Sequence, residues 1–370
     1  MPIRSFIAML LLAPLTLAQE TAPPLFAADT PIIDYQNPQL PDYGRIGMVV
    51  SPEKLAGEIG LDMLKQGGNA IDAAVATGFA LAVTLPRAGN LGGGGFMLVH
   101  LAESDEQVFI DYRETAPAGA SRDMFLNADG TVNKAKAYFS RQAAGVPGTV
   151  AGLIHAQTQY GKLPLATVIQ PAIDLAEQGF DTPLALHMSL TSRAERLAMD
   201  PEAKRIYLQG TANAPAPGAL FKQPDLARTL QRIRDKGHDG FYGGETAALI
   251  AADMAANDGL ITTDDLASYR ALERSPVRGT FKEFEIVSVA PPSSGGVHVL
   301  QMLNLLEPYP LKSYGHNSAE YLHRLIESMK LAYADRSRYL GDPDQTVVPT
   351  EALISKDYAD KRRQLITANR

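Results

Sequence analysis

Residues 89–117 read GNLGGGGFMLVHLAESDEQVFIDYRETAP, and this stretch decides how we expect the chain to fold. Four consecutive glycines (92–95) lead into an apolar run, and a polar turn at 103–106 separates it from a second run that ends on Arg113. Two apolar runs joined by a short polar turn predict a β-hairpin. Glycines of this density allow positive φ angles and the close approach of a backbone or ligand. An arginine at the mouth of such a loop suits bidentate binding of a carboxylate, so the segment predicts an anion-recognition site at a sheet edge.

Glycine-rich loops also bind phosphate, but the order of elements here is the reverse of a nucleotide-binding loop. A dinucleotide fingerprint places its glycines after a strand and before a helix. In this chain the segment before the glycines, 70–85, is predicted to be a helix, and the glycines lead into a strand. No Gly-Lys-Ser/Thr follows them. The sequence therefore argues against nucleotide binding at this position.

The first residues have the form of an export signal. Arg4 precedes an apolar run at 6–17, and Thr16-Leu17-Ala18 offers a small-residue cleavage site. The run is short for a bilayer span, with a retained membrane anchor as the alternative reading. We expect residues 1–18 to be a signal peptide, 19–41 an extended Pro-rich leader and 42–370 the folded domain. The protein is then expected to be periplasmic or secreted, with no stable membrane insertion.

Composition narrows the class of partner and cofactor. The chain has no cysteine, so stability must come from burial of a core rather than from disulfides. A net charge of −7 with no basic cluster argues against nucleic acid as a partner. No His-Glu-x-x-His set or similar cluster supports a metal site, and we expect neither a metal nor a cofactor.

Hydrophobic periodicity predicts many helices and few strands. Strands are expected at 47–50, in the hairpin and at 281–289. Helices are expected at 52–66, 70–84, 149–159, 165–178, 184–199, 226–236, 245–257, 262–269, 297–306 and 318–340, several of them bounded by Gly or Pro. Early strands followed by many helices predict a layered α/β or α+β domain.

Ser51-Pro52-Glu53-Lys54 matches Ser-x-x-Lys, the nucleophile motif of serine β-lactamases and penicillin-binding proteins. Those enzymes also need Ser-Asp-Asn and Lys-Thr-Gly, and neither is present. A capping role for Ser51 at the start of a helix explains the same residues without chemistry. A Gly-x-Ser-x-Gly esterase elbow is absent as well.

Three other groups of residues have both a chemical and a structural reading. Pro291-Pro292-Ser293-Ser294-Gly295-Gly296 at a helix start suits an anion or oxyanion site, although the local residues favour a plain strand-to-helix connection. On the last long helix, His323 and Glu327 are interpreted as a surface or interhelical polar pair. Asp335 with Arg336 and Arg338 is interpreted as a set of structural salt bridges. For Arg113 the structural alternative is pairing with Glu114 or Asp111.

Six blocks in one order and spacing resemble the large subunit of γ-glutamyltranspeptidase, of the exported bacterial type. They are GGNAIDAAVA (67–76), GNLGGGGFML (89–98), DYRETAP (111–117), GVPGTVAGL (145–153), PPSSGG (291–296) and AYADRSRYLGDP (332–343). The resemblance implies an N-terminal-nucleophile hydrolase fold, a four-layer α/β/β/α sandwich of which this chain is the large-subunit portion. In that family the precursor cuts itself, and the new N-terminal Thr of the small subunit becomes the nucleophile.

The resemblance also implies the chemistry and its participants. The Thr hydroxyl attacks the γ-glutamyl amide of glutathione or a related donor, and the acyl-enzyme passes the γ-glutamyl group to water, an amino acid or a peptide. The arginine of the block at 111–117 holds the α-carboxylate of the glutamyl group, which assigns substrate binding to Arg113 here. The implied partners are therefore a small subunit in a heterodimer, γ-glutamyl donors and amine acceptors.

One departure from the family pattern concerns the end of the chain. Residues 357–370 contain no Thr-Thr-His or similar processing junction. We therefore expect no catalytic residue in this chain and no activity from it alone. Two alternatives remain: a cephalosporin or glutaryl acylase relative, or an inactive, truncated carboxylate-binding protein. The arginine in DYRETAP favours an amino-acid donor over a glutaryl group, which lacks the α-amino acid head.

Overall fold

The computed structural model describes residues 41–367. The predicted signal peptide, 1–18, and all of the predicted leader except residue 41 lie outside the described residues. The described residues fall into two units, and the second, which begins at residue 49, holds every helix and strand of residues 41–367. The strand predicted at 47–50 is not formed, since these four residues have no regular secondary structure. Between residues 41 and 367, none of the helices has both the length and the apolar character needed to cross a membrane.

Two helices open the second unit: α1 (Lys54–Lys65) and α2 (Ala70–Thr84). The prediction that Ser51 caps the first helix is wrong by two residues. Glu53 is the N-cap, and its carboxylate accepts hydrogen bonds from the backbone N–H groups of Leu55 and Ala56, while the Ser51 hydroxyl accepts one from Glu53 N–H. Gly67, with φ +87°, allows the turn between the helices. Helix α2 is buried on almost every side, as its continuous apolar sequence predicts.

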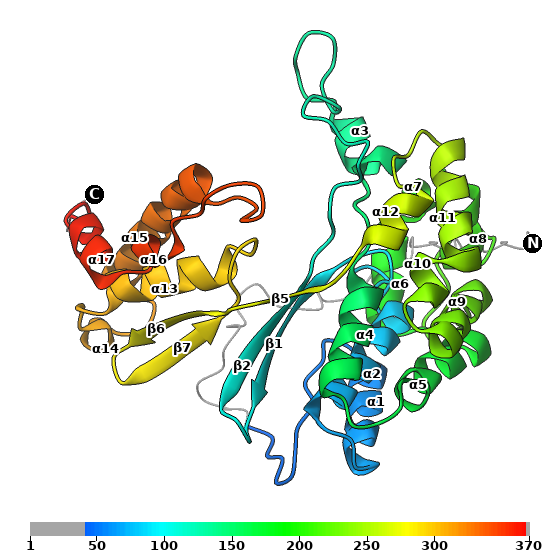
Figure 1. Cartoon of the computed structure of the whole chain (residues 1–370), viewed down its shortest axis with the longest axis horizontal. Coiled ribbons are helices and arrows are strands. Elements are labelled where there is room, and N and C mark those ends of the chain that lie inside the picture. Colours follow the sequence, from blue (N-terminus) through cyan, green and yellow to red (C-terminus); the bar gives the residue numbers. More distant parts are fainter. Residues whose placement is uncertain (1–40, 368–370) are drawn as a thin grey trace, which may run out of the picture. The chain divides into compact units, whose positions relative to one another are not determined.

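The predicted hairpin is confirmed. Strands β1 (Gly95–Leu101) and β2 (Glu106–Tyr112) pair antiparallel, and β5 (Leu272–Arg274) pairs antiparallel with β2, giving the sheet order β1-β2-β5 (Figure 1). Val99 lies opposite Val108, and both belong to the main hydrophobic core. The alternate positions point to the other face, where Phe96 pairs with Asp111 and the Phe96 and Phe109 rings lie 5.6 Å apart.

Of the two uses predicted for the glycines before the hairpin, positive φ angles are not found, whereas the close approach of a backbone is confirmed. Residues 92–95 are not among the glycines with positive φ. A Cβ on Gly94 would lie 2.5 Å from the carbonyl oxygen of Tyr112 and 2.7 Å from the backbone nitrogen of Glu114. The glycine therefore lets the chain pass directly against the backbone that carries Arg113.

Helices cover the core side of the hairpin and continue through the middle of the chain (Figure 1). The elements of this part are α3 (Lys134–Phe139), η1 (Arg141–Ala143), α4 (Thr149–Tyr160), α5 (Leu165–Gln178), β3 (Phe180–Asp181), α6 (Leu184–Thr191), α7 (Ala194–Leu197), α8 (Pro201–Tyr207), β4 (Leu220–Phe221), α9 (Pro224–Lys236), α10 (Asp239–Tyr242), α11 (Gly244–Ala256) and α12 (Thr263–Ser268). The single helix predicted at 184–199 is wrong. It breaks at Ser192 and Arg193, where the Ser192 hydroxyl donates to the Ser189 carbonyl and Arg193 leaves helical geometry.

The last part of the chain has a smaller core of its own. It contains β6 (Val277–Phe281), β7 (Phe284–Ser288), α13 (Gly295–Leu306), α14 (Leu311–Tyr314), α15 (Ala319–Tyr339), α16 (Thr350–Leu353) and α17 (Lys356–Arg363). The strand predicted at 281–289 corresponds to β7, and its partner β6 was not predicted. The two form a hairpin that turns at Lys282, with φ +53°, and Glu283. Val277, Val297, Leu300 and Leu353 form the core beneath them.

Candidate substrate-binding site

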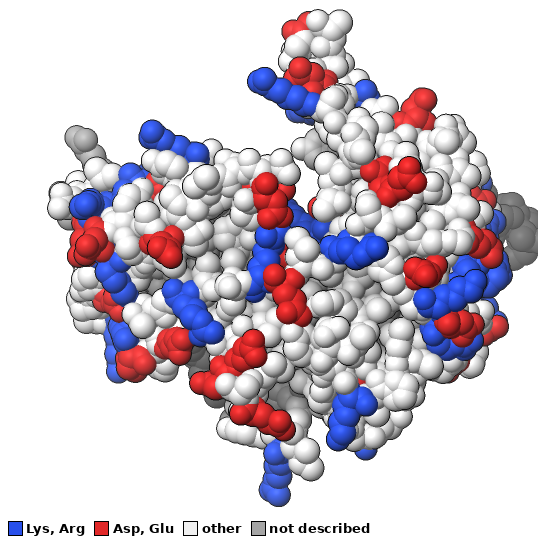
Figure 2. Space-filling view, viewed as in Figure 1, with Lys and Arg blue, Asp and Glu red and all other residues white. Residues whose placement is uncertain are grey.

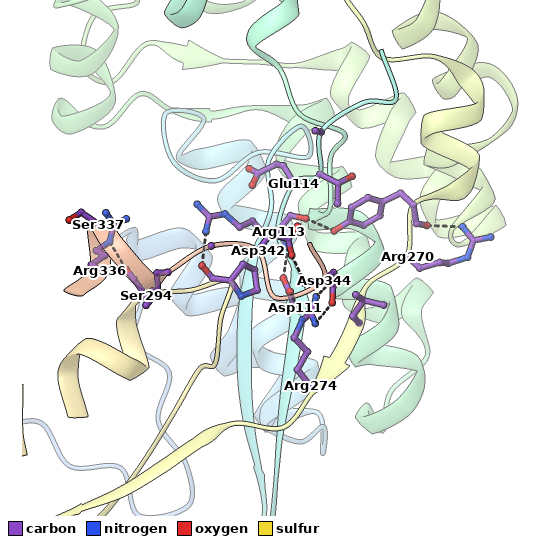
Figure 3. A pocket seen from close by; sticks show the side chains of 17 residues that line it. Asp111, Arg113, Glu114, Arg270, Arg274, Ser294, Arg336, Ser337, Asp342 and Asp344 are labelled. Carbon is purple, nitrogen blue, oxygen red and sulfur yellow. Dashed lines mark hydrogen bonds and ion pairs between the residues drawn. The ribbon is translucent and has the colours of Figure 1, made fainter. Parts of the chain in front are cut away.

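A cavity of about 540 Å³ lies where the end of β2, the strand β5, the turn before α13 and the end of α15 meet (Figure 3). Acidic and basic side chains are interspersed over the face of the molecule in Figure 2, so the charges that matter for a ligand are those inside the cavity. Four arginines and four carboxylates line it: Arg113, Arg270, Arg274, Arg336, Asp111, Glu114, Asp342 and Asp344.

Arg113, the predicted anion-binding residue, is exposed at this cavity. One terminal nitrogen of its guanidinium group donates to the carbonyl oxygen of Pro292 at 3.4 Å, and the group lies 5.9 Å from the centre of the Phe96 ring. No ion pair joins Arg113 to a carboxylate within residues 41–367, so the alternative of pairing with Glu114 or Asp111 is not what the structure contains. The side chain has its bidentate edge available for an anion.

The backbone of Arg113 is held on both sides. Its N–H donates to Asp111 Oδ1 at 3.1 Å, and its carbonyl accepts a hydrogen bond from the Tyr269 hydroxyl at 2.7 Å. Burial raises the pKa of Tyr269, so the hydroxyl stays protonated and remains a donor. The position of the arginine is thus fixed by a neighbour on its own strand and by a residue 156 positions further along the chain.

Arg274 fixes Asp111 in turn. Its Nε donates to Asp111 Oδ2 at 2.8 Å, while its two terminal nitrogens bind the carboxylate of Asp344 at 3.0 and 2.6 Å. The hydrogen bond from Arg274 lowers the pKa of Asp344 below its usual value. Asp111 and Arg274 are mostly buried, with side-chain exposures of 7% and 19%. Arg274 thus pairs with both carboxylates and fixes Asp111, which in turn holds the backbone of Arg113 (Figure 3).

The block at 145–153 supports the same loop through close backbone packing. Gly148 N–H and Thr149 N–H both donate to the carbonyl of Gly93, at 2.8 and 3.0 Å. A Cβ on Gly148 would collide with the carbonyl oxygen of Tyr112, and one on Gly152 would collide with the Tyr112 ring. These glycines are therefore explained by packing around Tyr112.

The turn at 291–296 comes to lie beside Arg113, which local sequence could not indicate. Ser294 is the N-cap residue of α13, but its side chain makes no capping bond. Its hydroxyl instead accepts a hydrogen bond from Nε of Arg336 at 3.1 Å. The structural salt-bridge interpretation of Arg336 is therefore wrong: it binds Ser294 and lines the cavity.

The other polar residues of α15 also have partners different from those predicted. His323 bonds to the carbonyl of Thr367 at 2.7 Å, and Glu327 pairs with Lys330 at 2.7 Å, so the two do not pair with each other. Asp335 is buried and pairs with Arg362 at 3.2 Å rather than with its neighbours on the helix.

The guanidinium group of Arg338 lies 5.3 Å from the centre of the Tyr339 ring. Within residues 41–367, no three His, Cys, Asp or Glu side chains are gathered as a metal-binding group.

Tyr269, Arg274 and Asp344 are parts of this site that the sequence did not reveal. Tyr269 and Arg274 lie in a segment with no recognisable motif, and Asp344 directly follows the block at 332–343. Their relation to Arg113 arises from pairing of β5 with β2, a three-residue contact between distant segments.

Comparison with known proteins gives a consistent result. A sequence profile of the family described as gamma-glutamyltranspeptidase matches residues 56–370. The chain is 45% identical over 324 residues to a glutathione hydrolase proenzyme of Escherichia coli K12, covering 88% of this chain and 56% of that protein. It is 41% identical over 341 residues to the Acylase ACY 1 proenzyme of Pseudomonas sp. strain SE83, covering 90% of this chain and 61% of the acylase.

A solved structure of Helicobacter pylori gamma-glutamyltranspeptidase superimposes with a TM-score of 0.87 at 44% identity, covering 90% of this chain and 95% of the chain solved. This likeness, with the mixed α/β composition, confirms the predicted N-terminal-nucleophile hydrolase fold. The chain spans little more than half the length of the curated relatives it matches, 56% in the case of the E. coli protein.

Proposed function

Because the chain belongs to the γ-glutamyltranspeptidase family, we propose that it is the large-subunit part of a γ-glutamyltranspeptidase or glutathione hydrolase. In this proposal Arg113 holds the α-carboxylate of the γ-glutamyl donor. The nucleophilic Thr comes from a small subunit that completes the enzyme. The observation that supports the proposal is an exposed Arg113 whose backbone is fixed by Asp111 and Tyr269 and whose guanidinium group pairs with no acid of residues 41–367.

The proposed reaction follows from this placement. The Thr hydroxyl attacks the γ-carbonyl carbon, and its own α-amine accepts the proton. The carbon–nitrogen bond breaks, the amine of the donor leaves with a proton, and an ester to Thr forms. Water or the amine of an amino acid or peptide then attacks this ester, which releases glutamate or a new γ-glutamyl compound. Arg113 contributes by fixing the donor so that its γ-carbonyl meets the nucleophile.

The same proposal includes export and inactivity of the chain without its partner. Residues 1–18 would direct the chain to the periplasm or the medium, as the charge and apolar run around Arg4 suggest. The large subunit would supply the carboxylate clamp and the small subunit the covalent chemistry, so turnover requires both.

The test uses this chain assembled with its small subunit and γ-glutamyl-p-nitroanilide as donor. Replacing Arg113 by Ala should cost on the order of 2–3 kcal/mol of binding, seen as a rise in KM of tens-fold, and Arg113→Lys should restore part of it. Arg122→Ala is the control, because that side chain is 95% exposed on the surface. An unchanged KM for Arg113→Ala would show that the clamp assignment is wrong.

A second donor, glutaryl-p-nitroanilide, tests the acylase alternative. This alternative is supported by the similarity to Acylase ACY 1. A glutaryl group keeps a carboxylate in the position of the α-carboxylate and lacks only the α-amino group, so Arg113→Ala should weaken binding of both donors, and the two functions are separated by which donor the unmodified enzyme prefers. Preference of the unmodified enzyme for the glutaryl substrate would favour the acylase. Binding of γ-glutamyl compounds without turnover of either substrate would favour an inactive carboxylate-binding protein.

A further inference from the structure

We propose that Arg336, held by Ser294, forms a second carboxylate subsite next to Arg113, so that the site prefers γ-glutamyl compounds whose amine part carries its own carboxylate. This inference rests on the proposed function for the role of Arg113. It adds a specificity residue on α15 that interacts with the amine part of the substrate.

The first step of the argument is the state of the Arg336 side chain. It is exposed at the cavity, and its Nε is occupied by the Ser294 hydroxyl at 3.1 Å. No carboxylate of residues 41–367 forms an ion pair with it, and its neighbour Asp335 is turned inward to Arg362. The hydrogen bond at Nε fixes the direction of the side chain, and both terminal nitrogens remain available to bind an anion.

The second step is that the two arginines share one turn and one hollow. Arg113 donates to the carbonyl of Pro292 and Arg336 to the hydroxyl of Ser294, two residues further along the same turn. The Cα atoms of residues two positions apart are separated by at most about 7 Å. Both guanidinium groups line the same hollow, so their like charges favour binding of an anion there. Figure 3 shows both side chains on the same side of the cavity, beside this turn.

The third step is the balance of charges. A hollow of about 380 Å³ adjoins the cavity and is lined by residues 94–96, Arg113, Glu114, residues 292–294 and Arg336. It therefore contains two arginines and one carboxylate, and Glu114 pairs with no cation of residues 41–367. A γ-glutamyl dipeptide carries the complementary set: two carboxylates and one ammonium group. A γ-glutamyl amide with an uncharged amine part leaves one arginine without a partner.

The carboxylate could belong to the donor or to the acceptor. The amine that leaves the donor and the amine that attacks the acyl-enzyme occupy the same place, because the second half of the reaction is the reverse of the first with a different amine. One subsite can therefore serve the C-terminal carboxylate of a γ-glutamyl peptide and that of a peptide acceptor.

The experiment compares two donors that differ only in this charge, γ-glutamylglycine and γ-glutamylglycinamide, using the chain assembled with its small subunit. The measured quantity is the ratio of kcat/KM for the acid to kcat/KM for the amide. We expect a ratio above one that falls roughly tenfold in Arg336→Gln, as for loss of a charge-assisted hydrogen bond, and that Arg336→Lys partly keeps. Arg338→Gln is the matched control on the same helix, because Arg338 does not line the cavity.

A second arm uses γ-glutamyl-p-nitroanilide as donor and compares glycylglycine with glycylglycinamide as acceptors. Loss of preference in the first arm supports a donor subsite, and loss in the second supports an acceptor subsite. A ratio in Arg336→Gln equal to that of the unmodified enzyme in both arms would overturn the inference. If Arg336→Gln does not fold, Ser294→Ala replaces it, since it removes only the hydrogen bond that directs the side chain.

Failure of the proposed function can be recognised separately. If the unmodified complex turns over neither donor, that function is wrong, and calorimetric titration with γ-glutamylglycine and its amide decides the inference. Tighter binding of the acid that is lost in Arg336→Gln would support the second carboxylate subsite. Equal affinity of the unmodified protein for both compounds would overturn it.

Discussion

Arg113 combines a rigid backbone with a side chain that no acid of residues 41–367 neutralises. Asp111 binds its N–H, Tyr269 binds its carbonyl, and Arg274 holds Asp111 from behind. Because these groups are already in place, the proposed binding of a carboxylate would not have to order the loop that carries the arginine. Fixing a binding group in advance reduces the entropy lost on association.

Removal of the Tyr269 hydroxyl tests this arrangement. Tyr269→Phe keeps the ring, which stacks on Tyr242 at 5.6 Å, but leaves the Arg113 carbonyl without its donor. We expect a loss of about 1 kcal/mol in the free energy of unfolding and, in the proposed complex with a small subunit, a several-fold rise in KM for the proposed γ-glutamyl donor. Urea denaturation and steady-state kinetics measure the two effects. Tyr138→Phe, at a side chain 73% exposed, is the control, and equal KM values for both variants would contradict the positioning role.

At the scale of the elements, the glycine run at the start of β1 lets that strand lie directly against the end of β2, from which Arg113 follows. Gly94 lies against the Tyr112–Glu114 backbone, whereas a Cβ on Gly92 would meet only Asn90 Oδ1, at 3.7 Å. We expect Gly94→Ala to destabilise the fold by about 1–3 kcal/mol through overpacking, and Gly92→Ala to change stability by less than about 0.5 kcal/mol. Thermal unfolding of the two variants measures the difference. Equal melting temperatures would mean that the close approach at Gly94 is not structurally required.

Helix α2 is joined to the connection between α4 and α5 by one buried carboxylate. Asp72 accepts hydrogen bonds from Asn69 N–H, from the Gln157 side chain and from the N–H groups of Lys162 and Leu163. Burial acts to raise its pKa, but these hydrogen bonds outweigh it, and the pKa of Asp72 lies below its usual value. We expect Asp72→Asn to cost about 3 kcal/mol near neutral pH, since the amide offers one acceptor in place of two.

The pH dependence of this loss has a definite sign. A carboxyl group with a lowered pKa in the folded state contributes its stability above its ordinary pKa of about 4, and that contribution disappears as the pH falls through the folded value. The difference in stability between the unmodified protein and Asp72→Asn should therefore shrink below about pH 4. Urea denaturation at several pH values measures it, with Asp62→Asn as an exposed control on α1. A difference that stays constant with pH would show that the ionised form of Asp72 is not the source of the stability.

The sequence predicted the elements whose boundaries are set locally. Asn69 and Thr262 cap helices through side chains of the types that favour N-caps, and Gly67 and Gly179 follow helices that end where predicted to within a residue. The sequence did not predict β5 or β6, because strands of three and five residues depend on partners elsewhere in the chain. For the same reason it identified Arg113 and the turn at 291–296 as separate features and not as neighbours 179 residues apart.

In the molecule as a whole, the second unit has two cores of unequal size, and the cavity depends on both. The larger core lies among the helices and the inner face of β1 and β2. The smaller one lies beneath β6 and β7. Arg113 follows β2, while Ser294 and Arg336 belong to helices packed on the smaller core. The hydrogen bonds from Arg113 and Arg274 to residues of that part are therefore what connect the site to both cores.

The chain on its own also carries an uncovered apolar stripe on α15. Leu322, Ile326, Met329 and Tyr333 follow helical spacing and are 37%, 52%, 40% and 57% exposed, whereas Ser328, Ala332 and Asp335 face inward. Contiguous apolar surface of this kind promotes association. We expect the chain without a partner to dimerise or aggregate, and Ile326→Glu to shift it toward the monomer without changing its melting temperature appreciably. Light scattering after size-exclusion chromatography, at several protein concentrations, measures the association.

Leu249→Glu is the matched control for the stripe. Leu249 is 58% exposed on α11, away from the four residues of α15, so a charge there should leave association unchanged. Equal effects of the two substitutions would mean that net charge and not the stripe governs association. A monodisperse monomer with a two-state melt for the unmodified chain would contradict the prediction altogether. Loss of association in Ile326→Glu together with weaker assembly with the small subunit would indicate that the stripe is the surface which that partner covers.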